Sequence, residues 1–181
     1  PGGSDYMEKD VVAAVQDGSL SEEYVDTCAK RVLRLMAKAA QSLNEAASFD
    51  TLAHHALAVV AAESGATLLK NEHAVLPLDE PENVVLIGSM AKSPRYQGAG
   101  SSHVNARMLI SPTDAMPHLP YCQGCNEDGS TTNELIEEAV AAAQASDVAV
   151  IFAGLPDSYE AEGFDRDTMM MPEGHIRMIE E

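Results

Sequence analysis

The chain has 181 residues, of which 45% are hydrophobic and 22% charged, a balance typical of a globular protein rather than a disordered one. Its 29 acidic and 11 basic residues give a formal net charge of -18. The electrostatic field of this negative charge repels phosphate backbones and anionic lipid heads, so the charge argues against nucleic acid and membrane surfaces as partners. No stretch approaches the roughly 20 apolar residues that cross a bilayer.

The three cysteines are Cys28, Cys122 and Cys125. An odd number of cysteines does not suggest a disulfide framework. The lack of such a framework favours a reducing compartment, so we expect a cytoplasmic protein. Cys122 and Cys125 have the C-x-x-C spacing of redox motifs and of half a zinc site. No second pair follows, and neither His103 nor His118 falls at metal-ligand spacing. We therefore predict free thiols, no metal site and no cofactor.

Helices are the first elements predicted along the chain. Residues 6–17 have a helical pattern that stops at Asp17-Gly18, and Ser19 with Glu22 offers a capping box for a second helix that ends near residue 40. The apolar residues of this second helix recur at i, i+3, i+4 and i+7 and form one stripe, which consists of Val25, Cys28, Ala29, Val32, Leu33 and Met36. The polar stretch 41–50 is the predicted linker.

A third helix is predicted from Thr51, with Asp50 as its cap, to about Ser64. The continuous apolar run from Val84 to Ile87 then ends at a glycine, which is typical of a strand buried on both faces of a parallel sheet. Residues 89–117 are rich in glycine, serine and proline and indicate a long loop.

The remaining elements complete an alternating pattern. "LPYCQGC" is a weaker strand candidate, and Thr131 with Glu134 forms a capping box that opens another helix. "DVAVIFAGL" predicts a second buried strand. This alternation indicates an α/β layered fold with a mostly parallel sheet. In such sheets ligands meet the loops that leave the carboxyl ends of the strands, here "GSMAKSPRYQGAGSS" and "PDSYEAEGFDRD".

Neither loop has the spacing of a phosphate-binding motif. The second loop instead gathers five carboxylates, on Asp157, Glu160, Glu162, Asp165 and Asp167. A general acid at a glycosidic oxygen needs a carboxyl group whose pKa is raised, and neighbouring carboxylates and partial burial both raise it. On the spacing alone, the favoured interpretation is a solvated acidic loop. Asp165 and Arg166 could pair with each other or anchor the loop.

Four strings resemble glycoside hydrolase family 3, the β-glucosidase and β-xylosidase family, and occur in the family's order. They are "AAESGATLLKNEHAVLPL", "VVLIG", "RYQGAGSSHVN" and "DVAVIFAGLPDSYEAEGFDRDTMMMPEGH". The upstream "KDVVAAVQDGSLSEEYVDTCAKRVLRLM" is similar to the closing helices of the family's N-terminal (β/α)8 barrel. The resemblance covers nearly the whole chain, and four motifs in order are more specific than any single one.

The resemblance implies a domain division and a set of site residues. Residues 1–40 would be the last helices of the barrel, 41–50 the linker and 51–181 part of an α/β sandwich. In the family's "EGFDR" motif the glutamate is the usual general acid/base, which is Glu162 here. The resemblance also implies that Ser101 lies near the sugar in the subsite for the non-reducing end. Asp165 and Arg166 would hold the loop.

The sequence also departs from the family pattern. The family's aspartate nucleophile and a sugar-gripping "KH" pair belong to the barrel, and "GSDY" at residues 3–6 is not the nucleophile motif. Retaining hydrolysis needs two carboxyl groups about 5–5.5 Å apart, and this chain supplies one. We expect an internal fragment that is inactive alone, from a retaining β-glycosidase that acts on terminal non-reducing β-D-glucosyl or xylosyl residues.

The chain stops in the helix that follows its last predicted strand, so we expect the predicted sheet to be incomplete. The apolar surface that an incomplete sheet exposes would favour a homo-oligomer. Two other functions stay open on the residues alone. One is a non-catalytic carbohydrate-binding or interaction module that uses the same loops, and the other is a nucleotide-binding α/β domain, which the net charge disfavours. Glucoside and xyloside specificity are not separated by these motifs.

Overall fold

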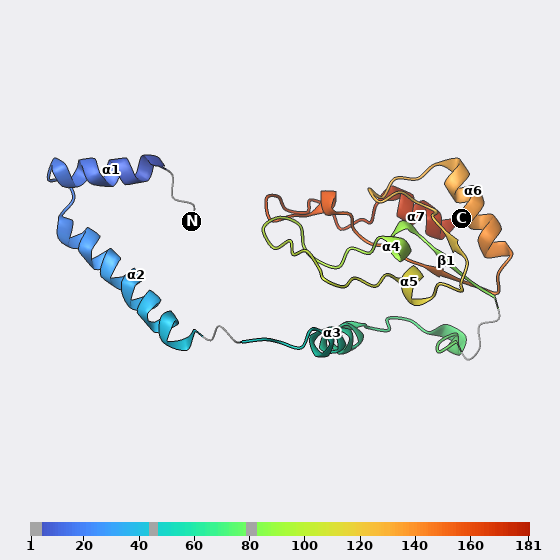
Figure 1. Ribbon diagram of the computed structural model, residues 1–181. Helices are drawn as coiled ribbons and strands as arrows, with labels where there is room; N and C mark the ends of the chain where they lie inside the picture. Colours follow the sequence, from blue (N-terminus) through green and yellow to red (C-terminus); the bar gives the residue numbers. More distant parts are fainter. Residues whose placement is uncertain (1–4, 44–46, 79–82) are drawn as a thin grey trace. The chain divides into compact units, whose positions relative to one another are not determined.

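The computed structural model describes residues 5–43, 47–78 and 83–181. The chain divides into two compact units, Pro1–Leu57 and Ala58–Glu181, each of which is considered by itself. Figure 1 shows the elements of both units in chain order. The first unit holds α1 (Asp5–Gln16) and α2 (Glu22–Ser42), and α3 (Thr51–Gly65) runs across the division.

The helix bounds in the first unit follow the predictions closely, but the predicted capping box of α2 is wrong. Ser21 is the N-cap of α2, and its hydroxyl accepts a hydrogen bond from Glu23 N at 3.3 Å. The hydroxyl of Ser19 instead donates to the carbonyl of Ala14, near the end of α1, at 3.2 Å. The predicted cap of α3 is confirmed, since the Asp50 carboxylate accepts from Leu52 N at 2.9 Å.

The second unit is an α/β domain built on a short sheet. After a 3-10 turn, η1 (Glu72–Ala74), its elements are β1 (Val84–Ile87), α4 (Ser89–Lys92), α5 (Pro112–Ala115), β2 (Tyr121–Cys122), α6 (Asn133–Gln144), β3 (Val148–Ile151), η2 (Asp157–Tyr159) and α7 (Glu173–Glu180). The long loop predicted for 89–117 therefore contains two single-turn helices. The N-cap of α6 is Thr132 rather than Thr131. The Thr132 hydroxyl accepts from Leu135 N at 3.3 Å, whereas the Thr131 hydroxyl donates to Gly124 O at 2.7 Å.

The sheet has the order β2-β1-β3, and both pairings are parallel. This confirms the predicted α/β fold class. All four residues of β1 are buried, as the apolar run predicted. The core lies between this sheet and the helices that pack on it, and it consists of Val85, Ile87, Cys125, Ile136, Ala139 and Met178.

The prediction of a second buried strand is wrong for β3. Ala149 and Ile151 are exposed, whereas Val148 and Val150 are half-buried. Ile151 pairs in register with Ile87 of β1, so the two side chains point to the same face of the sheet. On that face α6 contacts β1 and β2. Within the described residues, helices therefore do not fully cover this face of the sheet at its edge strand, β3.

The three cysteines are free, as predicted, and they differ in exposure. Cys28 is exposed, Cys122 is half-buried and Cys125 is buried in the core. Burial raises the pKa of the Cys122 thiol, so this thiol stays protonated near neutral pH. Within the described ranges, no helix has both the length and the apolar composition to cross a membrane.

Candidate functional site

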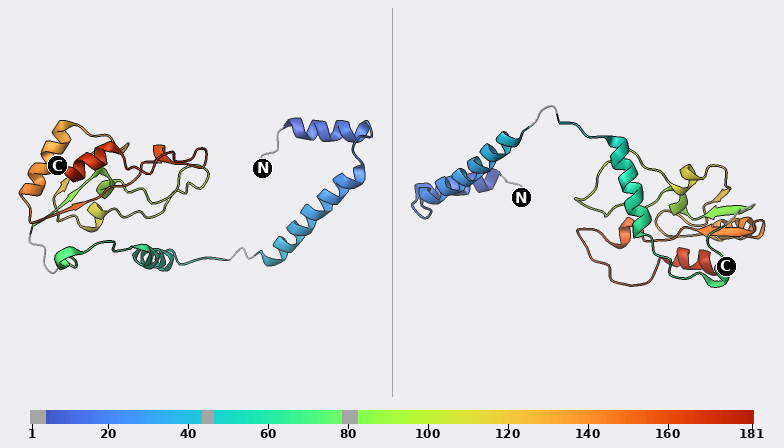
Figure 2. Two further views of the ribbon diagram at one scale, coloured as in Figure 1. Left: turned by 180° about the vertical axis from the view of Figure 1, so that it is seen from behind. Right: turned by 90° about the horizontal axis from the view of Figure 1, so that it is seen from below.

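Two loops leave the carboxyl-terminal side of the sheet and meet. The first loop, residues 93–111, follows β1 and α4, and the acidic loop, residues 152–172, follows β3. Figures 1 and 2 show the two loops running side by side away from the sheet. The backbone of Glu162, in the acidic loop, donates to Ala99 O of the first loop at 3.3 Å. The fold thus joins segments that are far apart in the sequence.

Glu162 lies at a tight turn of the acidic loop. Ala161 and Phe164 close this turn with two backbone hydrogen bonds, of 3.3 and 3.2 Å. Oε2 of Glu162 accepts a hydrogen bond from Ser101 N at 2.7 Å. The two residues that the resemblance assigned to acid/base catalysis and to sugar binding are therefore in direct contact.

Gly100 lets the two loops approach this closely. Its φ is +100°, and a Cβ atom at this position would lie 2.7 Å from Glu162 Cβ and 3.0 Å from Glu162 Oε2. A positive φ of this size is accessible chiefly to glycine. The glycine of the "GAGSS" string therefore provides both the backbone conformation and the space that the glutamate needs.

The pKa of Glu162 lies below its ordinary value, which corrects the expectation of a raised pKa. The first cause is hydrogen bonding with the Ser101 side chain, and the second is hydrogen bonding with the Ser101 backbone. Donors that face a carboxylate stabilise its charged form. Because this carboxyl group is exposed in the chain, burial does little to oppose them. Glu162 is therefore ionised at neutral pH in this structure.

Glu162, Asp165 and Arg166 line one hollow of about 380 Å³, which we call the Glu162 hollow. Arg166 does not pair with Asp165. Its guanidinium donates to Thr168 O and, at 3.1 Å, to Met170 O, so it bonds to the backbone that follows. Asp165 forms no hydrogen bond or ion pair within the described part of the chain.

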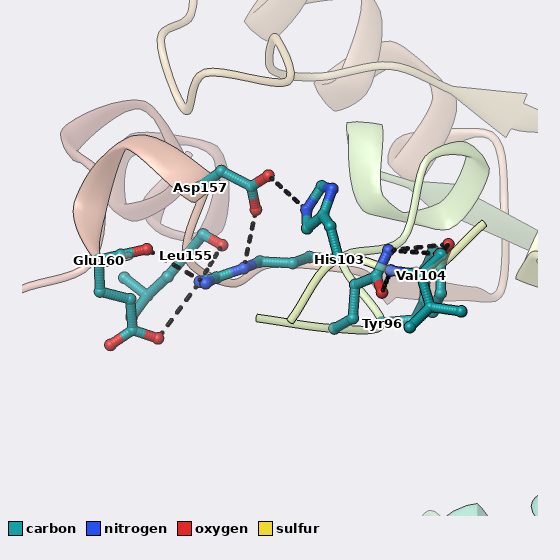
Figure 3. Close-up of polar contacts among 8 residues, drawn as sticks. Tyr96, His103, Val104, Leu155, Asp157 and Glu160 are labelled. Atoms are coloured by element: carbon teal, nitrogen blue, oxygen red, sulfur yellow. Dashed lines mark hydrogen bonds and ion pairs between the residues drawn. The ribbon is translucent and has the colours of Figure 1, made fainter. Parts of the chain in front are cut away.

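Arg95 is the residue of this site that sequence reasoning missed. From the first loop it donates to Leu155 O at 3.2 Å and to Glu160 Oε1 at 3.3 Å, and its Nε lies 2.9 Å from Asp157 Oδ1 (Figure 3). Its side chain is only 19% exposed. A half-buried cation with several partners on one loop fixes the position of that loop. The available signal was an arginine in one strand-end loop and five carboxylates in the other.

Comparisons with known proteins agree on one family. The C-terminal domain of glycosyl hydrolase family 3 matches residues 66–181. The thermostable beta-glucosidase B of Acetivibrio thermocellus is 44% identical over 96% of this chain and 24% of its own length. The exo-alpha-(1->6)-L-arabinopyranosidase of Bifidobacterium longum is 35% identical over 97% of this chain and 25% of its own length.

A solved structure gives the same result. The crystal structure of the Bifidobacterium adolescentis GH3 beta-glucosidase superimposes with a TM-score of 0.82 and 31% identity, and the match covers 98% of this chain and 27% of that one. The chain thus spans about a quarter of the length of the relatives it matches.

Proposed function

The chain belongs to glycoside hydrolase family 3, and from that premise we propose that it carries the general acid/base, Glu162, of a longer retaining β-glycosidase. Its substrates are glycosides with terminal non-reducing β-D-glucosyl or xylosyl residues. The observation that supports this assignment is the 2.7 Å contact between Glu162 Oε2 and Ser101 N. It places the glutamate of the "EGFDR" motif against the serine proposed to lie near the sugar.

Glu162 has two tasks in this proposal. As an acid it protonates the oxygen of the leaving group, and as a base it then deprotonates the water that releases the sugar from the enzyme. The nucleophile that holds the sugar between these steps is a second carboxylate, about 5–5.5 Å away in retaining enzymes. We propose that this carboxylate comes from the barrel of the longer protein.

The low pKa of Glu162 suits the second task better than the first. An ionised carboxylate can accept the proton of water, but it cannot protonate a leaving group. Burial under the barrel and the substrate, together with the charge of a nearby nucleophile, would raise the pKa of Glu162. Neither influence acts on Glu162 in the isolated chain, so there Glu162 can act only as a base.

The remaining assignments follow the same reasoning. We propose that residues 1–40 are the last helices of the barrel, that 41–50 are a linker and that 51–181 belong to the α/β sandwich. Asp165 and Arg166 shape the acidic loop. A cytoplasmic location, the absence of a cofactor and the absence of nucleic acid and membrane partners stay predictions from the composition.

The test is Glu162→Ala in the full-length protein, assayed on aryl β-glucosides with added azide. We expect turnover to fall by about 10²–10⁴-fold on a poor leaving group, and azide to restore turnover on an activated one. Azide restores it because this small anion needs no general base to attack the glycosyl-enzyme. The matched control is Glu160→Ala, which removes a carboxylate two residues away that is bonded to Arg95; azide should not rescue it.

Two results would contradict this proposal. Unchanged turnover of Glu162→Ala would remove Glu162 from the mechanism. A full-length protein that binds β-glucosides but hydrolyses none of them would favour the alternative, a non-catalytic carbohydrate-binding module.

A further inference from the structure

The side chain of Gln97 closes the part of the first loop that carries Ser101. Its Oε1 accepts a hydrogen bond from Val104 N at 2.9 Å, and its Nε2 donates to Val104 O at 3.2 Å (Figure 3). An amide side chain can donate and accept at once, so Gln97 pairs with Val104 as a second stretch of backbone would. Gln97 is half-buried. Residues 97–104 are therefore a closed segment, which we call the Ser101 turn.

The Ser101 turn presents a backbone donor to Glu162. Within the turn, His103 N donates to Gly100 O at 3.1 Å, so Ser101 is the first central residue of a β-turn. The hydrogen bond of a β-turn does not use the N–H of this residue. Ser101 N is thus available to Glu162, and it donates to Oε2 at 2.7 Å. The position of this donor depends on the closure of the turn by Gln97.

Arg95, two residues before Gln97, joins the first loop to the acidic loop. Besides its bonds to Leu155 O and Glu160 Oε1, it donates to Glu160 O at 3.4 Å, and its Nε lies 2.9 Å from Asp157 Oδ1 (Figure 3). The guanidinium is a planar fork whose donors have fixed directions, so several partners on one loop hold that loop in one position. These contacts fix the acidic loop just before the proposed acid/base.

Glu162 is thus held from two sides. Arg95 holds Glu160, which is two residues before Glu162 in the chain. Gln97 holds the turn from which Ser101 N bonds to the carboxylate. Glu162 is exposed, so packing does not fix its side chain. Neither Arg95 nor Gln97 forms a hydrogen bond with Glu162 in the described part of the chain, so both act on it through their neighbours.

We propose that Arg95 and Gln97 are positioning residues that place the carboxyl group of Glu162 at the leaving oxygen of the substrate. This inference rests on the proposed role of Glu162 as the acid/base. A general acid must lie within hydrogen-bonding reach of the oxygen that it protonates. A displacement of about 1 Å can lower the rate of such a step about 10²-fold. Loosening either side of this arrangement therefore weakens acid catalysis.

The test measures kcat/KM of the full-length protein on phenyl β-glucoside and on dinitrophenyl β-glucoside. The phenyl group needs a proton to leave and the dinitrophenyl group does not, so the ratio of the two kcat/KM values reports acid catalysis. The ratio is also independent of the fraction of the protein that folds. Arg95→Lys keeps the charge but loses the fork, and Gln97→Glu places a carboxylate against Val104 O. We expect each variant to lower the ratio about tenfold.

Two matched controls make the same chemical changes away from both loops. They are Arg177→Lys in α7 and Gln144→Glu at the exposed end of α6, and both should leave the ratio at its wild-type value. Glu162→Ala gives the ratio without acid catalysis. Arg95→Lys added to Glu162→Ala should lower the ratio no further, because a positioning residue acts only through the carboxyl group that it places.

Equal losses on both glucosides would mean that Arg95 and Gln97 serve the fold alone, and an unchanged ratio would mean that they do not position Glu162. Either result overturns the positioning role and leaves the proposed function intact, provided that Glu162→Ala still lowers the ratio. If Glu162→Ala leaves the ratio unchanged, the proposed function itself fails, and the positioning role fails with it.

Discussion

His175 is wholly buried in α7, three residues before the core residue Met178. Its Nδ1 accepts a hydrogen bond from Gly154 N at 3.3 Å, and its Nε2 has no hydrogen-bond partner in the described ranges. Burial lowers the pKa of this histidine, and the bond that Nδ1 accepts from Gly154 N also favours the neutral ring. Because Gly154 lies at the start of the acidic loop, the neutral imidazole fixes the base of that loop.

The lowered pKa of His175 predicts a loss of stability in acid. An unfolded histidine takes up a proton near its ordinary pKa of about 6.5, while the buried one stays neutral. As the pH falls below that value, the unfolded state therefore binds more protons and the free energy of unfolding decreases, by at most about 1.4 kcal/mol per pH unit. Above the ordinary pKa of histidine, the contribution of His175 to the free energy of unfolding is constant.

Urea unfolding of the chain at pH 5.5 and 7.5 measures this effect. His175→Gln keeps an oxygen that can accept from Gly154 N but cannot titrate, so the stability difference between the two pH values should shrink. His118→Gln, at an exposed position, is the control and should leave the difference unchanged. If His175→Gln retains the full difference, another group is responsible for it.

Glu162 and Arg95 show the limits of sequence reasoning at this scale. The resemblance singled out Glu162 from five carboxylates, but the direction of its pKa shift depends on Ser101, which is 61 residues away. Arg95 had no predicted role, because its partners Leu155 and Glu160 lie 60 and 65 residues further along the chain. No local pattern reports contacts over such separations.

Among the secondary-structure elements, Gly88 lies where the ends of all three strands meet. It follows β1, its N–H donates to Cys122 O at 3.0 Å, and Phe152 N donates to Ile87 O at 2.7 Å beside it. Its φ is +113°, and a Cβ atom would lie 2.2 Å from the carbonyl oxygen of Phe152. Backbone atoms cannot move aside without breaking the strand pairing.

Gly88→Ala should therefore destabilise the chain by about 2–4 kcal/mol, from the strain of a positive φ and from overpacking. The measurement is the free energy of unfolding in urea. Gly65→Ala is the matched control, because Gly65 has an unstrained φ and no atom within 4 Å of the added carbon. Equal stabilities of the two variants would show that the strand ends can separate without cost.

The elements themselves were predicted well where their signals are local. The bounds of α3 and β1 follow from a capping aspartate and from an apolar run that ends in glycine. The caps of α2 and α6 were misplaced by two residues and one residue, because Ser19 and Thr131 bond to Ala14 O and Gly124 O instead. The exposure of β3 could not be predicted, since it depends on which strands α6 covers.

At the scale of the molecule, each of the two units, considered by itself, leaves apolar surface uncovered among its described residues. No residue of α2 or α3 is buried, and the uncovered face at β3 adds Ile151, which is 37% exposed. Monomeric proteins rarely expose contiguous apolar patches larger than a few hundred Å². This exposed apolar surface predicts that the chain self-associates.

Sedimentation velocity over a hundredfold range of concentration tests this association. We expect the sedimentation coefficient to rise with concentration. Ile151→Lys should reduce association through the sheet face, whereas Ala141→Lys, at an exposed position of α6, adds the same charge and serves as the control. A single monomeric species at all concentrations would exclude the homo-oligomer.

We predict that the isolated chain does not hydrolyse glycosides, because it carries only the proposed acid/base, and the proposed mechanism takes its nucleophile from the barrel of the longer protein. The measurement is release of the aryl group from an aryl β-glucoside. Activity of the purified chain that disappears in Glu162→Gln would prove this prediction wrong, and the nucleophile would then have to lie within the chain.

The sequence by itself determined the α/β class, the approximate positions of the longer helices, the central strand and, through ordered motifs, the family. These features depend on residues within a few positions of one another, where periodicity, caps and glycines act directly. Only the tertiary structure decided that β3 is a half-covered edge, that Ser101 lowers the pKa of Glu162 and that Arg95 links the two loops. Each of these depends on strand order, which brings distant segments together and which no local pattern encodes.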